Sequence, residues 1–165
     1  MVDGAWDSGP RAPEAVCWLA DHDLVSVAAL SGRVSATGLA LACDLRLAAA
    51  GTVLVLGPLV DGAGPLVAAV GLARASAWCL TGAELAAEEA LAAGLVTAVV
   101  PAAELSAAVD DLVGRVLAHP RDAVVEGKAL LRGAVRRTGG EQWKAEADAR
   151  RRMGDKALEE ERPWT

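Results

Sequence analysis

The stretch Leu39-Ala40-Leu41-Ala42-Cys43-Asp44-Leu45-Arg46 decides how this chain folds. Its first half follows Gly38 and is rich in alanine and leucine, which are good helix formers. Its second half passes Asp44 and enters a short apolar run, which is typical of a buried strand. We therefore predict a short helix over Gly38–Cys43 that leads directly into a strand over Leu45–Ala48.

Apolar runs on both sides of this stretch predict further strands. Leu24–Leu30 ends at Ser31-Gly32, Val53–Leu56 follows Gly51, and Leu95–Val100 follows Gly94. Because these runs do not alternate with polar residues, we expect strands that are covered on both faces. That arrangement belongs to the α/β class of folds.

Helices are predicted between and after these strands. Their expected ranges are Pro65–Val70, Arg74–Leu80, Leu85–Ala93, Ala102–Ala118 and Arg121–Arg137. Gly94 suits the end of the third helix and Pro101 the first turn of the fourth. Gly139-Gly140 is expected to separate the last helix from the charged segment Glu141–Arg162, which predicts a solvated or subunit-bridging helix.

Composition narrows the function classes. The chain has 165 residues and a mass of 16.8 kDa, which fits one domain. Hydrophobic residues make up 53%, but the only aromatic residues are five Trp, so the core must be built from Ala, Leu and Val. The net charge of −6 and the pI of about 4.9 argue against a nucleic-acid partner, because such a surface must neutralise phosphates.

The sequence also indicates where the protein is located and whether its cysteines are free. The apolar runs are broken by charge and glycine well short of the roughly 20 residues of a membrane span, and the start of the chain is acidic, unlike a secretory signal. We therefore expect a cytoplasmic protein with no membrane contact. Cys17, Cys43 and Cys79 form no C-x-x-C pair, which favours buried free thiols over a disulfide or a metal site.

The quoted stretch is one of several segments that match a known family in order and spacing. The others are Ser26–Gly32, Val70–Ala75, Leu80–Gly82, Ala87–Val96 and Val99–Pro101, with a looser match from Lys128–Leu131 to Glu161–Trp164. Together they resemble the crotonase (enoyl-CoA hydratase/isomerase) superfamily, in which LALACDLR is a signature. The resemblance implies an α/β fold built as a ββα spiral.

The resemblance also implies an organisation and a chemistry. Residues 1–23 are a lead-in, 24–119 the α/β core and 120–165 a helical segment for trimerisation. The ligand is an acyl-CoA or a carrier-bound acyl thioester, with coenzyme A as the carrier and no other cofactor. Two backbone N–H groups stabilise the thioester enolate, because they face the oxygen on which negative charge develops. The partners are other copies, in a homotrimer or hexamer, or a complete crotonase homologue.

The sequence departs from the family pattern at the places where catalysis occurs. The N-terminal half, which supplies the other oxyanion N–H and much of the adenine pocket, has no counterpart before Asp23. The loop usually read as A-x-G-G-G-x-E is Gly32–Gly38 here and two residues shorter, with Ser35 in the place of the oxyanion glycine and Gly38 in that of the first glutamate. The second loop, Gly57–Pro65, retains Asp61 as its only carboxylate.

These departures define the candidate site. Both usual catalytic glutamates are absent, so hydration by two carboxylates lacks its residues, whereas a one-carboxylate isomerase or decarboxylase does not. The candidate catalytic groups are the N–H groups of Ser35 and Ala36 and the carboxylate of Asp61. The candidate substrate-binding residues are Thr37, Gly38, Gly62, Ala63, Gly64 and Lys128; no metal ligands are expected.

Each candidate has a structural alternative. Ser35 is a good N-cap type and could simply start a helix, with Gly38 relieving crowding between that helix and a strand. Asp61 could cap the segment Gly62–Val70. Lys128, with Arg132 and Arg136 at four-residue spacing, could hold the phosphates of CoA or form a solvated basic face.

The remaining polar and aromatic residues predict structural roles. Asp44 and Arg46 fit the family's structural signature as capping or ion-pairing residues. His22 and His119 are expected at the surface, and Trp78 in the core or an interface.

Three function classes therefore remain. The first is an enzyme, a lyase or isomerase acting on an acyl thioester by enolate stabilisation. The second is a catalytically degenerate subunit that binds or scaffolds a partner. The third is a serine peptidase of the related Clp type with Ser35 as nucleophile, which would need a base, and the first His and Lys after Ser35 are His119 and Lys128.

Overall fold

The computed structural model describes residue 19 and residues 23–58 and 62–160. The chain divides into two compact units, residues 1–113 and residues 114–165, which are described separately below. Among the described residues, no helix is long and apolar enough to cross a membrane.

Two three-stranded sheets form the framework of the first unit. One sheet has the order β1-β3-β6 and the other the order β2-β4-β5. All neighbours are parallel except β4 and β5. The strands are β1 (Val27–Leu30), β2 (Arg33–Val34), β3 (Leu45–Ala49), β4 (Val53–Val55), β5 (Glu84–Ala86) and β6 (Ala98–Val100).

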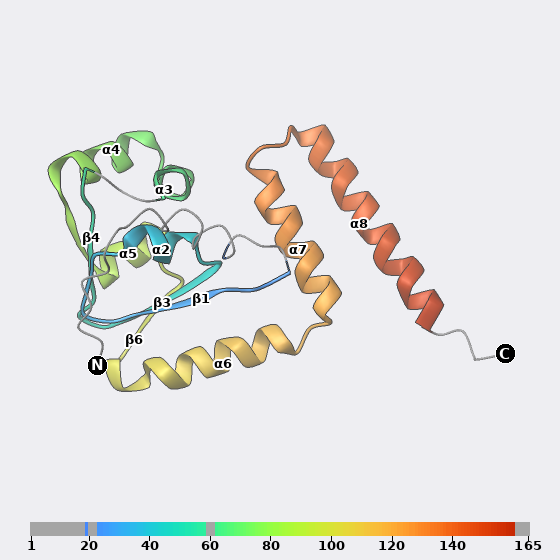
Figure 1. The fold of residues 1–165 in the computed structure, drawn as a ribbon, viewed down its shortest axis with the longest axis horizontal. Coiled ribbons are helices and arrows are strands. Elements are labelled where there is room, and N and C mark those ends of the chain that lie inside the picture. Colours follow the sequence, from blue (N-terminus) through green and yellow to red (C-terminus); the bar gives the residue numbers. More distant parts are fainter. Residues whose placement is uncertain (1–18, 20–22, 59–61, 161–165) are drawn as a thin grey trace. The chain divides into compact units, whose positions relative to one another are not determined.

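The chain winds through the two sheets as a spiral (Figure 1). β1, β2 and α2 (Thr37–Ala42) form one turn, and β3, β4 and α3 (Ala63–Val70) form the next. After α4 (Leu72–Thr81), the last turn consists of β5, α5 (Ala87–Ala92) and β6. Each turn gives one strand to each sheet. The predicted ββα spiral is therefore confirmed, including the helix-to-strand passage in the quoted stretch.

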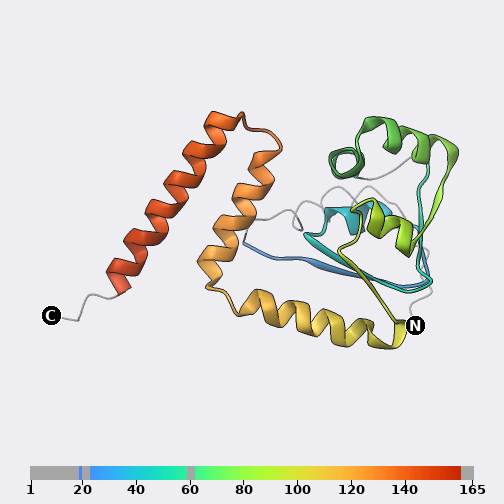
Figure 2. The ribbon, with the colours of Figure 1, turned by 180° about the vertical axis from the view of Figure 1, so that it is seen from behind.

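The core of the first unit is aliphatic, as the composition predicts. Its largest fully buried apolar side chains are Leu54, Leu56, Leu66, Leu85 and Leu95. Leu54 and Leu85 lie in β4 and β5 of one sheet, Leu66 lies in α3, and Leu56 and Leu95 follow β4 and α5. Figure 2 shows these helices and strands from behind. Trp78, predicted in the core or an interface, is partly buried and packs against this core. The Arg74 guanidinium lies 5.7 Å from its ring centroid.

The helix predicted over Leu85–Ala93 begins two residues later than expected. Leu85 lies in β5, where it pairs with Leu54 of β4, and the helix starts only at Ala87. A buried leucine fits the apolar pattern of a helix as well as that of a strand, so strand pairing decides the conformation here. The predicted end at Gly94 is correct: it has φ +76°, and the N–H groups of Gly94 and Leu95 close the helix on Leu91 and Ala90 carbonyls at 3.0 and 2.8 Å.

The helices at the C-terminal end follow the predicted order. A 3-10 turn, η2 (Ala102–Glu104), precedes α6 (Leu105–Leu117), and the boundary between the units falls within α6. In the second unit, α7 (Arg121–Ala134) and α8 (Gly139–Glu160) form a hairpin. Arg152 of α8 ties the two helices together by donating to both carboxylate oxygens of Glu126 on α7, at 3.0 and 2.9 Å.

Two predictions for this hairpin are wrong. Gly139-Gly140 does not separate helices but forms the first turn of α8, because Thr138 and Glu141 build a capping box around it. The N–H and hydroxyl of Thr138 donate to Glu141 Oε2 at 2.8 and 2.9 Å. In addition, α7 ends at Ala134, so Arg136 lies in a turn closed on the Gly133 carbonyl and not on a common helical face with Lys128.

Candidate functional site

The turn between β2 and α2 carries two unused hydrogen-bond donors. Ser35 and Ala36 are both exposed, and neither N–H donates to any other group in the described part of the chain. Ala36 is the N-cap residue of α2, with φ −80° and ψ 47°, and no side chain caps the helix. The alternative in which Ser35 caps this helix is therefore wrong. The turn instead presents two free N–H groups at the surface.

Thr37 lies next in the chain but points inward. It is 1% exposed, and its hydroxyl lies 2.8 Å from the carbonyl oxygen of Val55 and 3.3 Å from that of Val34. The hydroxyl joins the start of α2 to the end of β4. Thr37 was a predicted substrate contact, but its side chain is occupied inside the fold, which no pattern in the sequence indicates.

The start of α3 lies directly against the start of α2. Gly62 is the N-cap of α3, with φ +94°, and a Cβ atom placed on it would lie 3.1 Å from Gly38 Cα and Gly38 O. Gly38 is buried, and its backbone lies against Gly62 at the start of α3. Any side chain at Gly62 would meet both backbone strain and this contact. The structure thus places Gly62 beside Gly38.

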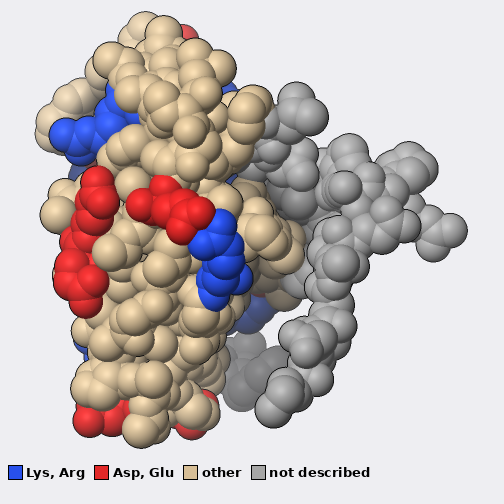
Figure 3. Space-filling model, turned by 90° about the vertical axis from the view of Figure 1, so that its left-hand side faces the viewer, with Lys and Arg blue, Asp and Glu red and all other residues tan. Residues whose placement is uncertain are grey.

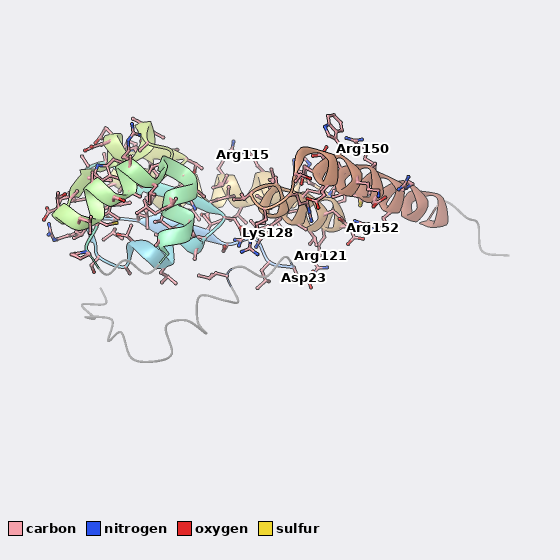
Figure 4. The ribbon with its side chains drawn as sticks, turned by 90° about the horizontal axis from the view of Figure 1, so that it is seen from above. Asp23, Arg115, Arg121, Lys128, Arg150 and Arg152 are labelled. Atoms are coloured by element: carbon pink, nitrogen blue, oxygen red, sulfur yellow. The ribbon has the colours of Figure 1, made fainter. Side chains whose placement is uncertain are left out.

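The predicted site residues fall into three groups. Ser35 to Gly38 and Gly62 to Gly64 come together in the first unit through the α2–α3 contact, and Ala63 and Gly64 are exposed. Asp61 lies outside the described residues, and the N-cap of α3 is Gly62. Lys128 belongs to the second unit, where it is buried on α7, as labelled in Figure 4, and is therefore not part of a solvated face.

Two carboxylates of the first unit serve the framework. Asp44 Oδ2 accepts hydrogen bonds from both the N–H and the hydroxyl of Ser26, each at 2.9 Å. Glu84 accepts two from Arg33 at 2.6 and 2.5 Å, and this bond lowers the pKa of Glu84. Figure 3 shows a face on which uncharged side chains dominate and charged groups gather in small clusters. Neither carboxylate is left to act as a general base.

Arg46 has a structural role, as predicted for this part of the signature. Its Nε donates to the Leu95 carbonyl at 2.5 Å and its NH1 group to the Cys43 carbonyl at 2.6 Å. Burial lowers the pKa of the guanidinium, and the nearby Cys43 and Asp44 act in the opposite direction. The signature is therefore a framework element: Asp44 and Arg46 bind backbone groups on either side of β3.

No metal site is formed by the described residues, since no three His, Cys, Asp or Glu side chains gather there. Cys43 and Cys79 are free thiols; Cys79 is buried as predicted, whereas Cys43 is only partly buried. His119 is exposed, as expected. Cys17 and His22 lie outside the described residues. The Ser35 hydroxyl has no hydrogen bond within the described part of the chain, so no base activates it there.

Comparison with known proteins points to one family. The family model described as enoyl-CoA hydratase/isomerase matches residues 11–162. None of the curated proteins compared with the chain matches it.

Solved structures agree. A protein from Thermobifida fusca YX that carries the name enoyl-CoA hydratase, solved with acetoacetyl-CoA, is 38% identical over 86% of this chain and 60% of its own, with a TM-score of 0.80. Its complex with CoA gives 35% identity over 88% and 60%, with a TM-score of 0.79. The enoyl-CoA hydratase of Mycobacterium smegmatis shares the fold at 22% identity, with coverages of 93% and 66% and a TM-score of 0.81. The chain thus spans about 60% of the length of the first two structures.

Proposed function

Since the chain belongs to the enoyl-CoA hydratase/isomerase family, we propose that it binds an acyl-CoA thioester and stabilises the enolate of that thioester. The donors are the N–H groups of Ser35 and Ala36. The carbonyl oxygen of the thioester gains negative charge when a proton is removed beside it, and N–H groups already in place stabilise that charge without rearrangement.

The free state of these two N–H groups carries the proposal. Buried backbone N–H groups are almost always paired within the protein, whereas these two lie in an exposed turn and have no protein partner in the described part of the chain. Two adjacent unpaired donors in such a turn are suited to an oxyanion. The Thermobifida fusca protein, which shares the fold and is 38% identical to this chain over the matched region, was solved with acetoacetyl-CoA bound. That ligand contains the type of enolisable thioester that the turn would recognise.

Calorimetric titration with acetoacetyl-CoA and with free CoA tests the proposal. We expect acetoacetyl-CoA to bind more tightly than CoA, and the enolate absorbance of the bound ligand to exceed that of the free ligand at the same pH. Equal affinities, or no enolate signal, would contradict oxyanion stabilisation. The choice of reaction is tested by Asp61→Asn, which we expect to stop α-proton exchange with solvent deuterium while leaving the affinity in place.

A degenerate binding or scaffolding subunit is the second candidate. It is favoured by Gly38, which stands where the family's first glutamate would be and has no side chain that could act as a general base. For this function we expect a stable oligomer, supported by residues 120–165, that neither binds acetoacetyl-CoA nor exchanges its α-proton. Light scattering before the titration helps to distinguish the enzyme from the scaffolding subunit. A trimer or hexamer that shows no ligand binding in calorimetry favours the scaffolding subunit.

A further inference from the structure

The register of β2 against β4 raises a question about the Ala36 N–H. Arg33 pairs with Val53 and Val34 with Leu54 in a parallel ladder, which begins with the Val53 N–H donating to the Gly32 carbonyl at 2.9 Å. In a parallel ladder the bonds alternate evenly along the strands. The next bond would join the Ala36 N–H to the Val55 carbonyl. That bond is missing, and the ladder stops at Val34.

The Thr37 hydroxyl takes the place of the missing bond. It donates to the Val55 oxygen at 2.8 Å, so that carbonyl is satisfied without the Ala36 N–H. A threonine hydroxyl has one proton to donate, and here the proton is used inside the fold on a side chain that is 1% exposed. Ala36 meanwhile adopts φ −80° and ψ 47°, outside the strand region, and its N–H makes no ladder bond.

We propose that Thr37 is a positioning residue: its hydroxyl bonds the Val55 carbonyl in place of the Ala36 N–H and so keeps that N–H free for an oxyanion. The use of this N–H by an oxyanion rests on the proposed function, whereas the effect of the Thr37 hydroxyl on the Ala36 N–H does not. Without the hydroxyl, the donor that the ladder register assigns to the Val55 carbonyl is the Ala36 N–H, and forming that bond would cost the turn one of its two free donors.

Three variants of the full chain separate the hydroxyl from its surroundings. Thr37→Val removes the hydroxyl and keeps the shape, whereas Thr37→Ser keeps the hydroxyl. Thr52→Val is the matched control, because Thr52 is another fully buried threonine whose hydroxyl donates to a strand carbonyl, that of Leu30 at 3.1 Å. Thr52 lies just before β4, whereas Val55 ends that strand.

Amide hydrogen exchange by NMR reads the state of the Ala36 N–H without any ligand. In the unsubstituted chain, we expect Ala36 to exchange much faster than its ladder neighbours Val34 and Val55. In Thr37→Val its exchange should slow by about tenfold, as a new hydrogen bond forms. In Thr37→Ser and in Thr52→Val the rate should stay at the starting value. Slow exchange of Ala36 in the unsubstituted chain overturns the proposal even if Thr37→Val does not fold, and so does an unchanged rate in Thr37→Val.

The enolate absorbance of bound acetoacetyl-CoA tests whether the positioning role of Thr37 matters for the proposed function. We expect the enolate fraction to fall in Thr37→Val and to be restored in Thr37→Ser, while Thr52→Val leaves it unchanged. A fall of equal size in Thr52→Val would mean that the effect is one of general stability and would overturn the positioning role. If no variant binds acetoacetyl-CoA, the proposed function fails, whereas the exchange rates still decide the role of Thr37.

Discussion

Two helices of this chain begin in opposite ways. At the start of α8, the N–H and hydroxyl of Thr138 both bond Glu141, and the Glu141 N–H faces the Thr138 hydroxyl at 3.5 Å. At the start of α2, no side chain caps the helix, no acidic residue lies in the first turn, and the N–H groups of Ser35 and Ala36 are unused. Side chains bond the Thr138 and Glu141 N–H groups at one start, whereas no side chain bonds the N–H groups of Ser35 and Ala36 at the other.

The difference shows how the same local problem can serve stability or binding. Every helix leaves its first N–H groups without intrahelical partners. At the start of α8, the neighbouring side chains of Thr138 and Glu141 form a capping box. The start of α2 is held instead by tertiary contacts, the Thr37 hydroxyl on Val55 and the approach of Gly62 to Gly38. Tertiary support leaves the donors open to a ligand.

The largest expected effect comes from removing one open donor. Ala36→Pro deletes the N–H at a residue whose φ of −80° a proline can adopt, and that N–H is bonded to nothing in the described chain. We expect the fold to persist and the α-proton acidity of bound acetoacetyl-CoA to fall by about 100- to 1,000-fold, the usual effect of a lost oxyanion donor. The measurement is the enolate absorbance as a function of pH.

The matched control for Ala36→Pro lies at the other helix start. Gly139→Pro deletes an N–H in the first turn of α8, where proline is well tolerated. It should leave the enolate absorbance unchanged. If the two proline variants behave alike, the open start of α2 has no special role, and the comparison between the helices breaks down.

The next effect tests the tertiary support of α2. Gly62→Ala places a side chain at φ +94° and brings its Cβ to 3.1 Å from the backbone of Gly38. We expect a loss of about 1–3 kcal/mol in the free energy of unfolding, which urea denaturation would measure. Gly94→Ala is the control, because it also has positive φ but meets no atom within 4 Å. A Gly62→Ala loss no larger than that of Gly94→Ala would show that the contact with Gly38 is not tight.

A smaller effect is expected at the capped start. Thr138→Ala removes the hydroxyl that bonds Glu141, and we expect the second unit to lose about 1 kcal/mol of stability. Thr138→Ser keeps the hydroxyl and should retain most of that stability. Urea denaturation followed by helical circular dichroism measures both variants. An unchanged midpoint in Thr138→Ala would show that the capping box contributes nothing to α8.

Much of the fold could be predicted from the sequence because the signature places helix and strand side by side. The passage from α2 to β3, with Asp44 on Ser26 and Arg46 on two carbonyls, lies where the sequence indicates it. Leu85 and the Gly139-Gly140 pair depart from their predicted conformations for different reasons. Strand pairing with β4 decides the first and is invisible in a short apolar run. The capping pattern Thr138-x-x-Glu141 was readable and outweighs the two glycines.

The candidate site could be predicted only in part. The family resemblance indicates the two loops, and the turn at Ser35 and Ala36 has two N–H groups without a partner in the described part of the chain. The inward direction of Thr37 depends on where the β2–β4 ladder ends, which is a property of two strands and not of one segment. Sequence patterns report the periodicity of a single helix or strand, so they do not predict the register between two strands.

The smallest expected effect is one of acid on the capped helix. Hydrogen bonds from the Thr138 backbone and hydroxyl, with a contribution from Arg137, lower the pKa of Glu141 from its ordinary value of 4.5. A lowered pKa in the folded state adds stability above pH 4.5, and this stability is lost as the pH falls through the lowered value. The effect is small because Glu141 is fully exposed.

Glu141→Gln keeps an acceptor for the Thr138 N–H but does not titrate. We therefore expect the stability difference between the unsubstituted chain and Glu141→Gln to shrink as the pH falls below 4.5, and a constant difference would contradict the capping role. The open start of α2 has no acidic group in its first turn and should show no such dependence.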